Sequence, residues 1–156
     1  MRYLAIDLGE KRTGLAAGDS ETRIVSPLTV LDVSMSVANG QLLLEGIARE
    51  VEAHLGPARA AGTAGARLDS PGELVIGLPL NMDGTDSPRT QSTRAFARNL
   101  LPLGLPILLW DERWSTAAVE RAMIAADVSR AKRAERIDSA AAAFILQGAI
   151  DAMTRG

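Results

Sequence analysis

The order of the apolar segments is the feature that most constrains how this chain folds. The first three segments are short and follow one another closely, at residues 2–8, 12–18 and 23–31. Runs of this length, separated only by turn-forming residues, are typical of β-strands joined by tight turns. The beginning of the chain is therefore predicted to form a three-stranded antiparallel meander.

The apolar period changes at residue 41, where side chains recur at spacings of three and four residues. This is the stripe of an amphipathic helix. Its members are Leu44, Ile47, Val51 and Leu55. The following residues, 56–72, are rich in Gly, Ala and Pro without a sustained period, which predicts a surface loop.

Strands and helices alternate in the rest of the chain. Continuous apolar runs at residues 73–80 and 105–110 indicate strands buried on both faces. Ser87-Pro88 is a helix start for a segment that extends to about Leu100, and Ser115 or Thr116 can cap another helix. A charged connector, residues 129–136, separates that helix from a last one. The last helix is expected to bury one face, formed by Ile137, Ala141, Phe144, Ile145 and Gly148.

These elements predict an α/β fold in the order βββαβαβα, with an extra helix before the end. The strands form a mixed five-stranded sheet, in which two parallel strands join the antiparallel meander and helices flank both faces. The 156 residues, of which 47% are hydrophobic, suit one domain with one core, so residues 1–156 are expected to fold as a unit.

The composition excludes several classes of function. A net charge of −2 argues against bulk attraction to nucleic acid, and 3% aromatic residues leave few rings for base stacking. The chain has no cysteine and one histidine, His54, so thiolate zinc sites and Ser-His-Asp triads are poorly supplied. The first apolar run is broken by Asp7, too early for a signal peptide or a membrane span, which predicts a soluble cytoplasmic protein.

Acidic residues fall where parallel strands end. Asp7 closes the first strand inside IDLG, and Asp111-Glu112 follow the strand at residues 105–110. In an open α/β sheet, ligands gather at the carboxyl ends of the strands. Asp138, in the first turn of the expected last helix, lies beside the apolar stripe of that helix and is the third candidate ligand. The alternative interpretation of an acid at this position is a favourable interaction with the helix N-terminus. Adjacent strand residues point in different directions, so one of Asp111 and Glu112 is expected to face the site.

Other ionisable residues are assigned structural roles. Asp83 and Asp86 lie in a turn-like DGTDSP segment, where capping roles are favoured and substrate contact is a further option. Glu73 opens its strand and should lie at the opposite edge of the sheet. His54 has no companion ligand at helical spacing and is expected to be a surface or packing residue.

Carboxylates that converge from separate strands and a helix suit Mg²⁺ or Mn²⁺, which prefer oxygen ligands. Two such ions roughly 4 Å apart can activate water and stabilise the leaving oxygen of a phosphodiester. Basic residues lie beside the same acids in sequence, and they are expected to contact a nucleic-acid backbone. They are Lys11, Arg12, Arg130, Lys132, Arg133 and Arg136. For the segment before Asp138, a solvated connector is an equally strong interpretation.

Four ordered motifs, IDLGEKRTGLA, VIGLPLNMDGT, DERWST and RIDSAAAAFIL, resemble those of the YqgF/RuvX family. The resemblance implies a ribonuclease H-like fold, related to the Holliday junction resolvase RuvC, and a metal-dependent nuclease. It assigns Asp7, Asp111, Glu112 and Asp138 as catalytic acids, with metal bound by Asp7, Glu112 and Asp138. Asn81 and Arg113, which lie within these motifs, join the expected nucleic-acid-binding residues.

Pre-16S rRNA 5′-end maturation is the activity expected from this resemblance, with precursor rRNA as substrate and ribosomal particles as further partners. Resolution of branched DNA is the alternative, and a stable dimer rather than a monomer would favour it. Gly77-Leu78-Pro79 stands where resolvases carry another Glu, which bears on how a second metal would be held. The segment at residues 56–72 also looks longer than the family's usual connection.

Two rival functions come from other classes. IDLG followed by a further Gly also resembles the first phosphate loop of actin-like ATPases, but these need a second domain that 156 residues cannot supply. A noncatalytic RNA-binding factor could keep the same fold, although the retained acids argue against it.

Overall fold

The computed structural model describes residues 1–55, 72–111 and 130–155, and for residues 130–139 and 154–155 it describes the backbone alone. The strands are β1 (Arg2–Leu8), β2 (Thr13–Asp19), β3 (Val25–Leu31), β4 (Gly72–Leu78) and β5 (Ile107–Asp111). The helices are α1 (Gln41–Leu55), α2 (Pro88–Asn99) and α4 (Arg130–Arg155), with short 3-10 turns at Val37–Gly40 and Leu101–Leu103. Residues 56–71 of the loop expected at 56–72 lie outside the described residues, as does the helix expected to be capped by Ser115 or Thr116, and Gly72 begins β4 instead of ending that loop.

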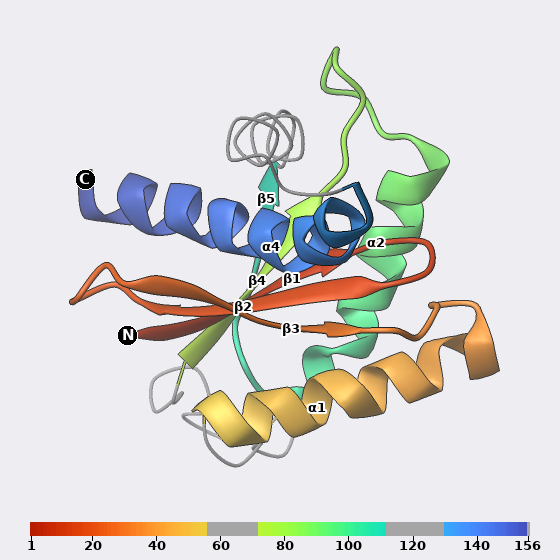
Figure 1. Ribbon diagram of the computed structural model, residues 1–156, viewed down its shortest axis with the longest axis horizontal. Helices are drawn as coiled ribbons and strands as arrows, with labels where there is room; N and C mark the ends of the chain where they lie inside the picture. The colour runs from red at the N-terminus through yellow and green to blue at the C-terminus, as the bar shows by residue number, and fades with distance from the viewer. Residues whose placement is uncertain (56–71, 112–129, 156) are drawn as a thin grey trace.

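The strands form one mixed sheet in the order β3-β2-β1-β4-β5 (Figure 1). β1 pairs antiparallel with β2, and β2 pairs antiparallel with β3, which completes the meander. β4 pairs parallel with β1 on one side and with β5 on the other. The predicted combination of a meander with two parallel strands is therefore confirmed.

Side chains alternate along β1 between two apolar layers. Leu4 and Ile6 belong to the layer that contains α1 and α2. Tyr3 and Ala5 point to the opposite face, where they pack with buried residues of α4. The helices accordingly cover both faces of the sheet, as Figure 1 shows with α4 on one side and α1 on the other. Within the described part of the chain, no helix meets the length and hydropathy of a membrane span.

The start of α2 follows its local sequence. The Ser87 side chain accepts a hydrogen bond from the backbone N–H of Thr90, and the Thr90 side chain accepts one from the backbone N–H of Ser87. This reciprocal capping box satisfies two otherwise unpaired amide groups, and Pro88 fits the first turn, where no amide donor is needed. The predicted helix start at Ser87-Pro88 is confirmed. In α1, Leu43 is fully buried with Ile47, whereas Leu44 is only partly buried.

Two predictions for the last helix were wrong. First, α4 begins at Arg130, so residues 130–136 of the expected connector are helical. Alanine, lysine, arginine and glutamate are all good helix formers. A segment made of them has no large apolar side chains, so it shows no apolar period from which a helix could be predicted. Second, Phe144 is 49% exposed. Ala141 and Ile145 are buried as predicted, and the described buried stripe is Ala141, Ala142, Ile145, Leu146, Ala149 and Ile150.

Candidate active site

The carboxyl ends of β1, β4 and β5 lie at one edge of the sheet because these three strands are parallel. Asp7 is the penultimate residue of β1, and Asp111 is the last residue of β5. β4 lies between them, with Ile76 paired to Ile6 and Leu78 paired to Asp111. The fold therefore brings two of the predicted acids to the same edge, on strands that flank β4.

Asp7 is a buried carboxylate, 9% exposed. It lies one pair from the end of the β1–β2 ladder, opposite Gly14 of β2, and it continues the alternation of Tyr3 and Ala5 toward the α4 face. Removing a carboxylate from water is costly unless a cation or hydrogen-bond donors compensate. Asp7 therefore lies within a strand, next to its last residue.

Asp111 lies on the other face of the sheet. It follows Ile107 and Leu109 at spacings of two residues, and both of these pack against the layer of α1 and α2. Strand alternation therefore places Asp111 on the face opposite Asp7, where it is exposed. Glu112, its neighbour in the DER motif, lies outside the described residues, as does Arg113.

Asp138 lies on α4, four residues before Ala142 and seven before Ile145, both of which are buried against the sheet. At the other end of the helix, the Tyr3 hydroxyl donates to the Met153 sulfur at 3.2 Å. The end of α4 thus lies over the start of β1, and the helix leads back toward the carboxyl ends of the strands (Figure 1). Among the described side chains, no three acidic or histidine groups form a metal-binding cluster.

The β1–β2 turn positions two predicted basic residues beside the same edge. The Gly9 N–H donates to the Arg12 carbonyl at 2.9 Å. A Cβ on Gly9 would collide with that carbonyl oxygen, which explains the glycine of the IDLG motif. Lys11 at the turn is exposed and Arg12 is half-buried. The four basic residues expected near Asp138 lie on the N-terminal part of α4.

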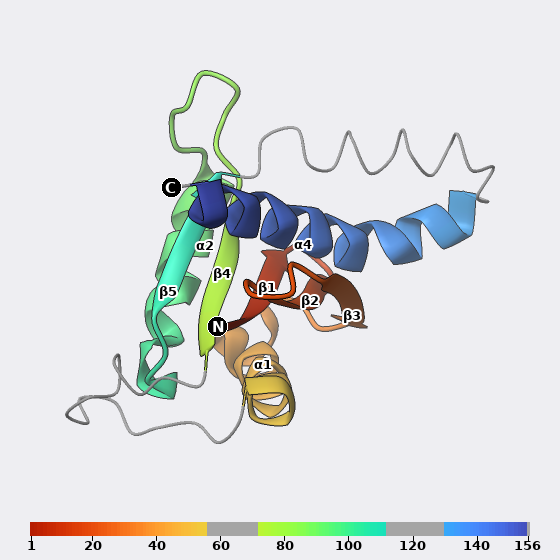
Figure 2. The same cartoon turned by 90° about the vertical axis from the view of Figure 1, so that its left-hand side faces the viewer.

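The loop after β4 is organised by its own polar side chains, and Figure 2 shows it extending beyond the edge of the sheet. The Asn81 amide donates to the Thr85 hydroxyl at 3.0 Å, and Asp83 accepts from the Thr85 N–H at 3.0 Å. Asp86 accepts two hydrogen bonds from Arg94 of α2, at 3.1 and 3.2 Å. Asp83 and Asp86 therefore have the turn and ion-pair contacts expected of loop residues.

Arg89, in the first turn of α2, is a residue of this edge that the sequence pattern did not single out. Its Nη2 donates to the Leu8 carbonyl at 2.8 Å. Leu8 directly follows Asp7, so the guanidinium is fixed beside the end of β1. The two residues are separated by 81 positions, and nothing in the local sequence of either one indicates the contact.

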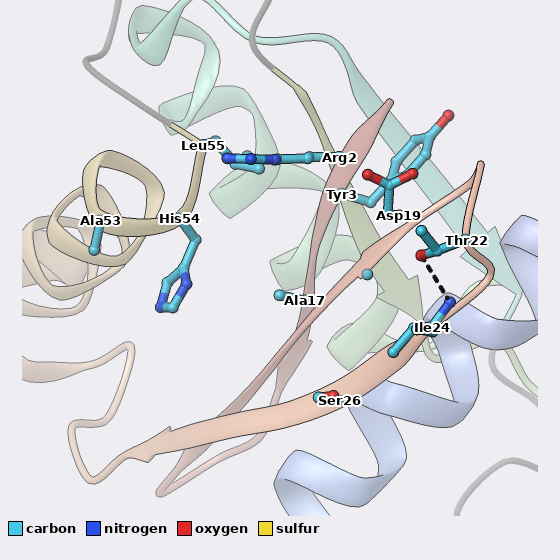
Figure 3. A pocket seen from close by; sticks show the side chains of 11 residues that line it. Arg2, Tyr3, Ala17, Asp19, Thr22, Ile24, Ser26, Ala53, His54 and Leu55 are labelled. Carbon is cyan, nitrogen blue, oxygen red and sulfur yellow. Dashed lines mark hydrogen bonds between the residues drawn. The ribbon is translucent and has the colours of Figure 1, made fainter.

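A separate cavity of about 460 Å³ lies at the opposite end of the strands (Figure 3). Its lining includes Arg2, Asp19 and His54, which come from the start of β1, the end of β2 and the end of α1. His54 contacts Glu50 at 3.3 Å, one helical turn away, and this fits the surface role expected for it. Hydrogen bonding from the Glu21 backbone N–H holds the pKa of Asp19 below its ordinary value. This cavity is remote from Asp7 along β1.

The structure of T. thermophilus RuvC in complex with a Holliday junction substrate has the same fold. It is similar with a TM-score of 0.51 and 15% sequence identity, over 99% of this chain and 96% of that one. At that identity the likeness concerns the fold, which is therefore ribonuclease H-like, as the motif resemblance implied.

Sequence comparison identifies the family within this fold. The family model RuvX, described as a Holliday junction resolvase, matches residues 61–152. A relative from Novosphingobium aromaticivorans is 50% identical over 150 residues, covering 96% of this chain and 84% of that protein. One from Sphingopyxis alaskensis is 95% identical over 82 residues, covering 53% of this chain and 54% of that protein. Both relatives are named as candidate pre-16S rRNA nucleases. The chain belongs to the RuvX family.

Proposed function

We propose that this protein is a metal-dependent nuclease that hydrolyses phosphodiester bonds in the 5′-end maturation of precursor 16S rRNA. The observation that carries the proposal is the buried Asp7 at the carboxyl end of β1, on the face covered by α4, in a member of the RuvX family. A carboxylate in that position is what a divalent cation site at the strand ends requires.

We assign metal binding to Asp7, Glu112 and Asp138. Asp138 is included because its position on α4 continues the spacing of the residues that face the sheet, four before Ala142. Asp111 is given a supporting role because it shares the face of Leu109, away from Asp7. Such an all-oxygen donor set fits Mg²⁺ or Mn²⁺.

The residues of this chain would act by fixing charge in place. A divalent cation, when bound, supplies Lewis-acid chemistry for attack by water on phosphorus and for the departure of the leaving oxygen. Asp7 is suited to hold it because a strand residue opposite Gly14 has little freedom to move. Preorganised charge of this kind costs no rearrangement during the reaction.

Substrate recognition is assigned to local basic groups because the whole chain carries a net charge of −2. The proposed backbone contacts are Lys11 and Arg12 in the β1–β2 turn, the four basic residues Arg130, Lys132, Arg133 and Arg136 on α4, and also Asn81 and Arg113. We further propose a cytoplasmic protein that acts on precursor rRNA or its ribosomal particles, as a monomer or homodimer.

Resolution of Holliday junctions is the second candidate. The family description and the substrate of the RuvC complex favour it. Carboxylate-bound metals can cut either backbone, and the choice of substrate comes from surface contacts.

A side-by-side cleavage assay tests the proposal. Purified protein is offered a precursor rRNA 5′ leader, an unrelated single-stranded RNA and a four-way DNA junction, each with Mg²⁺, with Mn²⁺ and with EDTA. We expect metal-dependent cleavage of the rRNA leader. Cleavage of the junction with the leader left intact would favour the resolvase, and cleavage that persists in EDTA would contradict metal dependence.

A further inference from the structure

Among the basic side chains that the structure describes, Arg89 forms a hydrogen bond to the end of β1. Its Nη2 donates to the carbonyl oxygen of Leu8 at 2.8 Å, one residue beyond Asp7. The ladder between β1 and β4 ends at the pair Ile6–Ile76, so Arg89 contacts β1 beyond its last pair with β4. The contact holds the guanidinium at the edge where we propose that the phosphodiester binds.

Most of the hydrogen-bonding capacity of Arg89 remains available. A guanidinium carries five N–H donors in a planar fork, and the Leu8 carbonyl uses one of them. Among the described residues, the salt bridges do not include Arg89. The arginine of α2 that pairs with a carboxylate is Arg94. Arg94 lies on the same helix, and both of its contacts go to Asp86.

These contacts separate two kinds of arginine on α2. Arg94 is neutralised by a carboxylate and organises the loop after β4. Arg89 is exposed, keeps its charge without a carboxylate partner in the described residues, and is positioned by a neutral carbonyl. A guanidinium that is already fixed loses less conformational freedom when it binds an anion, and its planar fork matches two oxygens of a phosphate.

We propose that Arg89 is a ligand of the substrate's phosphate, gripping the nucleic-acid backbone next to the position of Asp7. This inference rests on the proposed function, because it assigns a role within the same site. The hydrogen bond to the Leu8 carbonyl sets where the other N–H groups of Arg89 lie. On substrate binding, these groups would contact the nonbridging phosphate oxygens of the nucleic-acid strand that is cleaved. The expected effect of losing Arg89 is weaker binding with a smaller dependence on salt.

The test measures binding without cleavage. Fluorescence anisotropy with a labelled single-stranded RNA oligonucleotide, in EDTA and over a range of KCl concentrations, is carried out on wild type, Arg89→Gln, Arg89→Lys and Arg98→Gln. Arg98 is the matched control, because it is an exposed arginine in the last turn of the same helix. Circular dichroism checks that each variant is folded, and Arg89→Lys keeps the charge should the glutamine variant lose structure.

We expect Arg89→Gln to weaken binding by about tenfold and to flatten the slope of log affinity against log salt by roughly 0.7, the value for one lost phosphate contact on a single strand. Arg89→Lys should bind more weakly than wild type but keep the slope, and Arg98→Gln should resemble wild type. Equal affinity and slope in wild type and folded Arg89→Gln would overturn the inference.

Cleavage by the same preparations separates this inference from the proposed function. If wild type cleaves RNA and Arg89→Gln binds as wild type does, the Arg89 assignment alone fails. If wild type cleaves nothing while Arg89→Gln binds more weakly, the nuclease proposal fails and Arg89 remains a phosphate ligand. Absence of RNA binding by wild type would overturn both.

Discussion

The rotation of α4 about its axis decides whether Asp138 faces the sheet, and two adjacent residues of that helix test it. Ile145 is 1% exposed and packs against the sheet, whereas Phe144 is 49% exposed. Asp138 lies seven residues before Ile145, which is close to two helical turns, so the two positions share a face. We predict that Ile145→Ala destabilises the protein far more than Phe144→Ala.

The magnitudes follow from burial. Replacing a fully buried isoleucine by alanine costs about 2–5 kcal/mol, because it removes transfer energy and leaves a cavity. Full burial of a phenylalanine side chain is worth about 1.5–3 kcal/mol. Since about half of Phe144 is exposed already, its truncation should cost roughly 1 kcal/mol or less, and the higher helix propensity of alanine recovers about 0.5 kcal/mol of that.

Equilibrium urea unfolding, followed by circular dichroism, measures both free energies. We expect the two variants to differ by at least about 1.5 kcal/mol in the free energy of unfolding, with the isoleucine variant less stable. An equal or larger loss for Phe144→Ala would mean that α4 is rotated from the described register. Asp138 would then no longer share the sheet-facing stripe, and the proposed donor set would lose one of its members.

Three further predictions concern charge. Asp7→Asn should leave the melting temperature in EDTA unchanged or higher, because it relieves repulsion among the carboxylates that we propose bind the metal; a large drop would make Asp7 a structural partner instead. Replacing Arg130, Lys132 and Arg133 with Ala should keep α4 helical while weakening RNA binding, and should flatten the salt slope by roughly 0.7 per lost contact; an unchanged slope would leave these residues without a phosphate role. Burial, and then the negative charge of Glu73, raise the pKa of Tyr3 above the ordinary value. The stability that Tyr3 contributes should therefore be present below the pKa of unfolded tyrosine and be lost as pH rises through the folded pKa. Because the chain has one tyrosine, phenolate absorbance measures the folded pKa directly, and a folded pKa at or below the ordinary value would contradict the prediction.

The sheet could be predicted from the sequence because each described strand carries its own signal. The apolar runs marked all five strands within a few residues, and Ser87-Pro88 marked the start of α2 through a capping box that needs only neighbouring residues. The placement of Asp7 and Asp111 at one edge of the sheet followed from the parallel direction of their strands. The continuous apolar runs, alternating with helices, had indicated that direction.

What the sequence did not reveal depends on tertiary contacts. Phe144 and Ile145 are equally apolar, and only the fit of α4 against the sheet decides which one is buried. The bond from Arg89 to Leu8 joins residues far apart in the chain, and nothing local marks it. The start of α4 at Arg130 was missed because a charged helical turn without apolar residues has no hydrophobic period.

We propose above all that Asp7 holds the metal that cleavage requires, and the most direct measurement is turnover of the precursor rRNA leader by Asp7→Asn. Asp19→Asn serves as the control, because Asp19 is a carboxylate at the opposite end of the same antiparallel pair, across from Arg2. With saturating substrate and Mg²⁺ or Mn²⁺, and with folding checked by circular dichroism, we predict that Asp7→Asn lowers turnover by about a hundredfold or more and that Asp138→Asn does the same, while Asp19→Asn cleaves like wild type. Cleavage by folded Asp7→Asn at close to the wild-type rate would contradict the account.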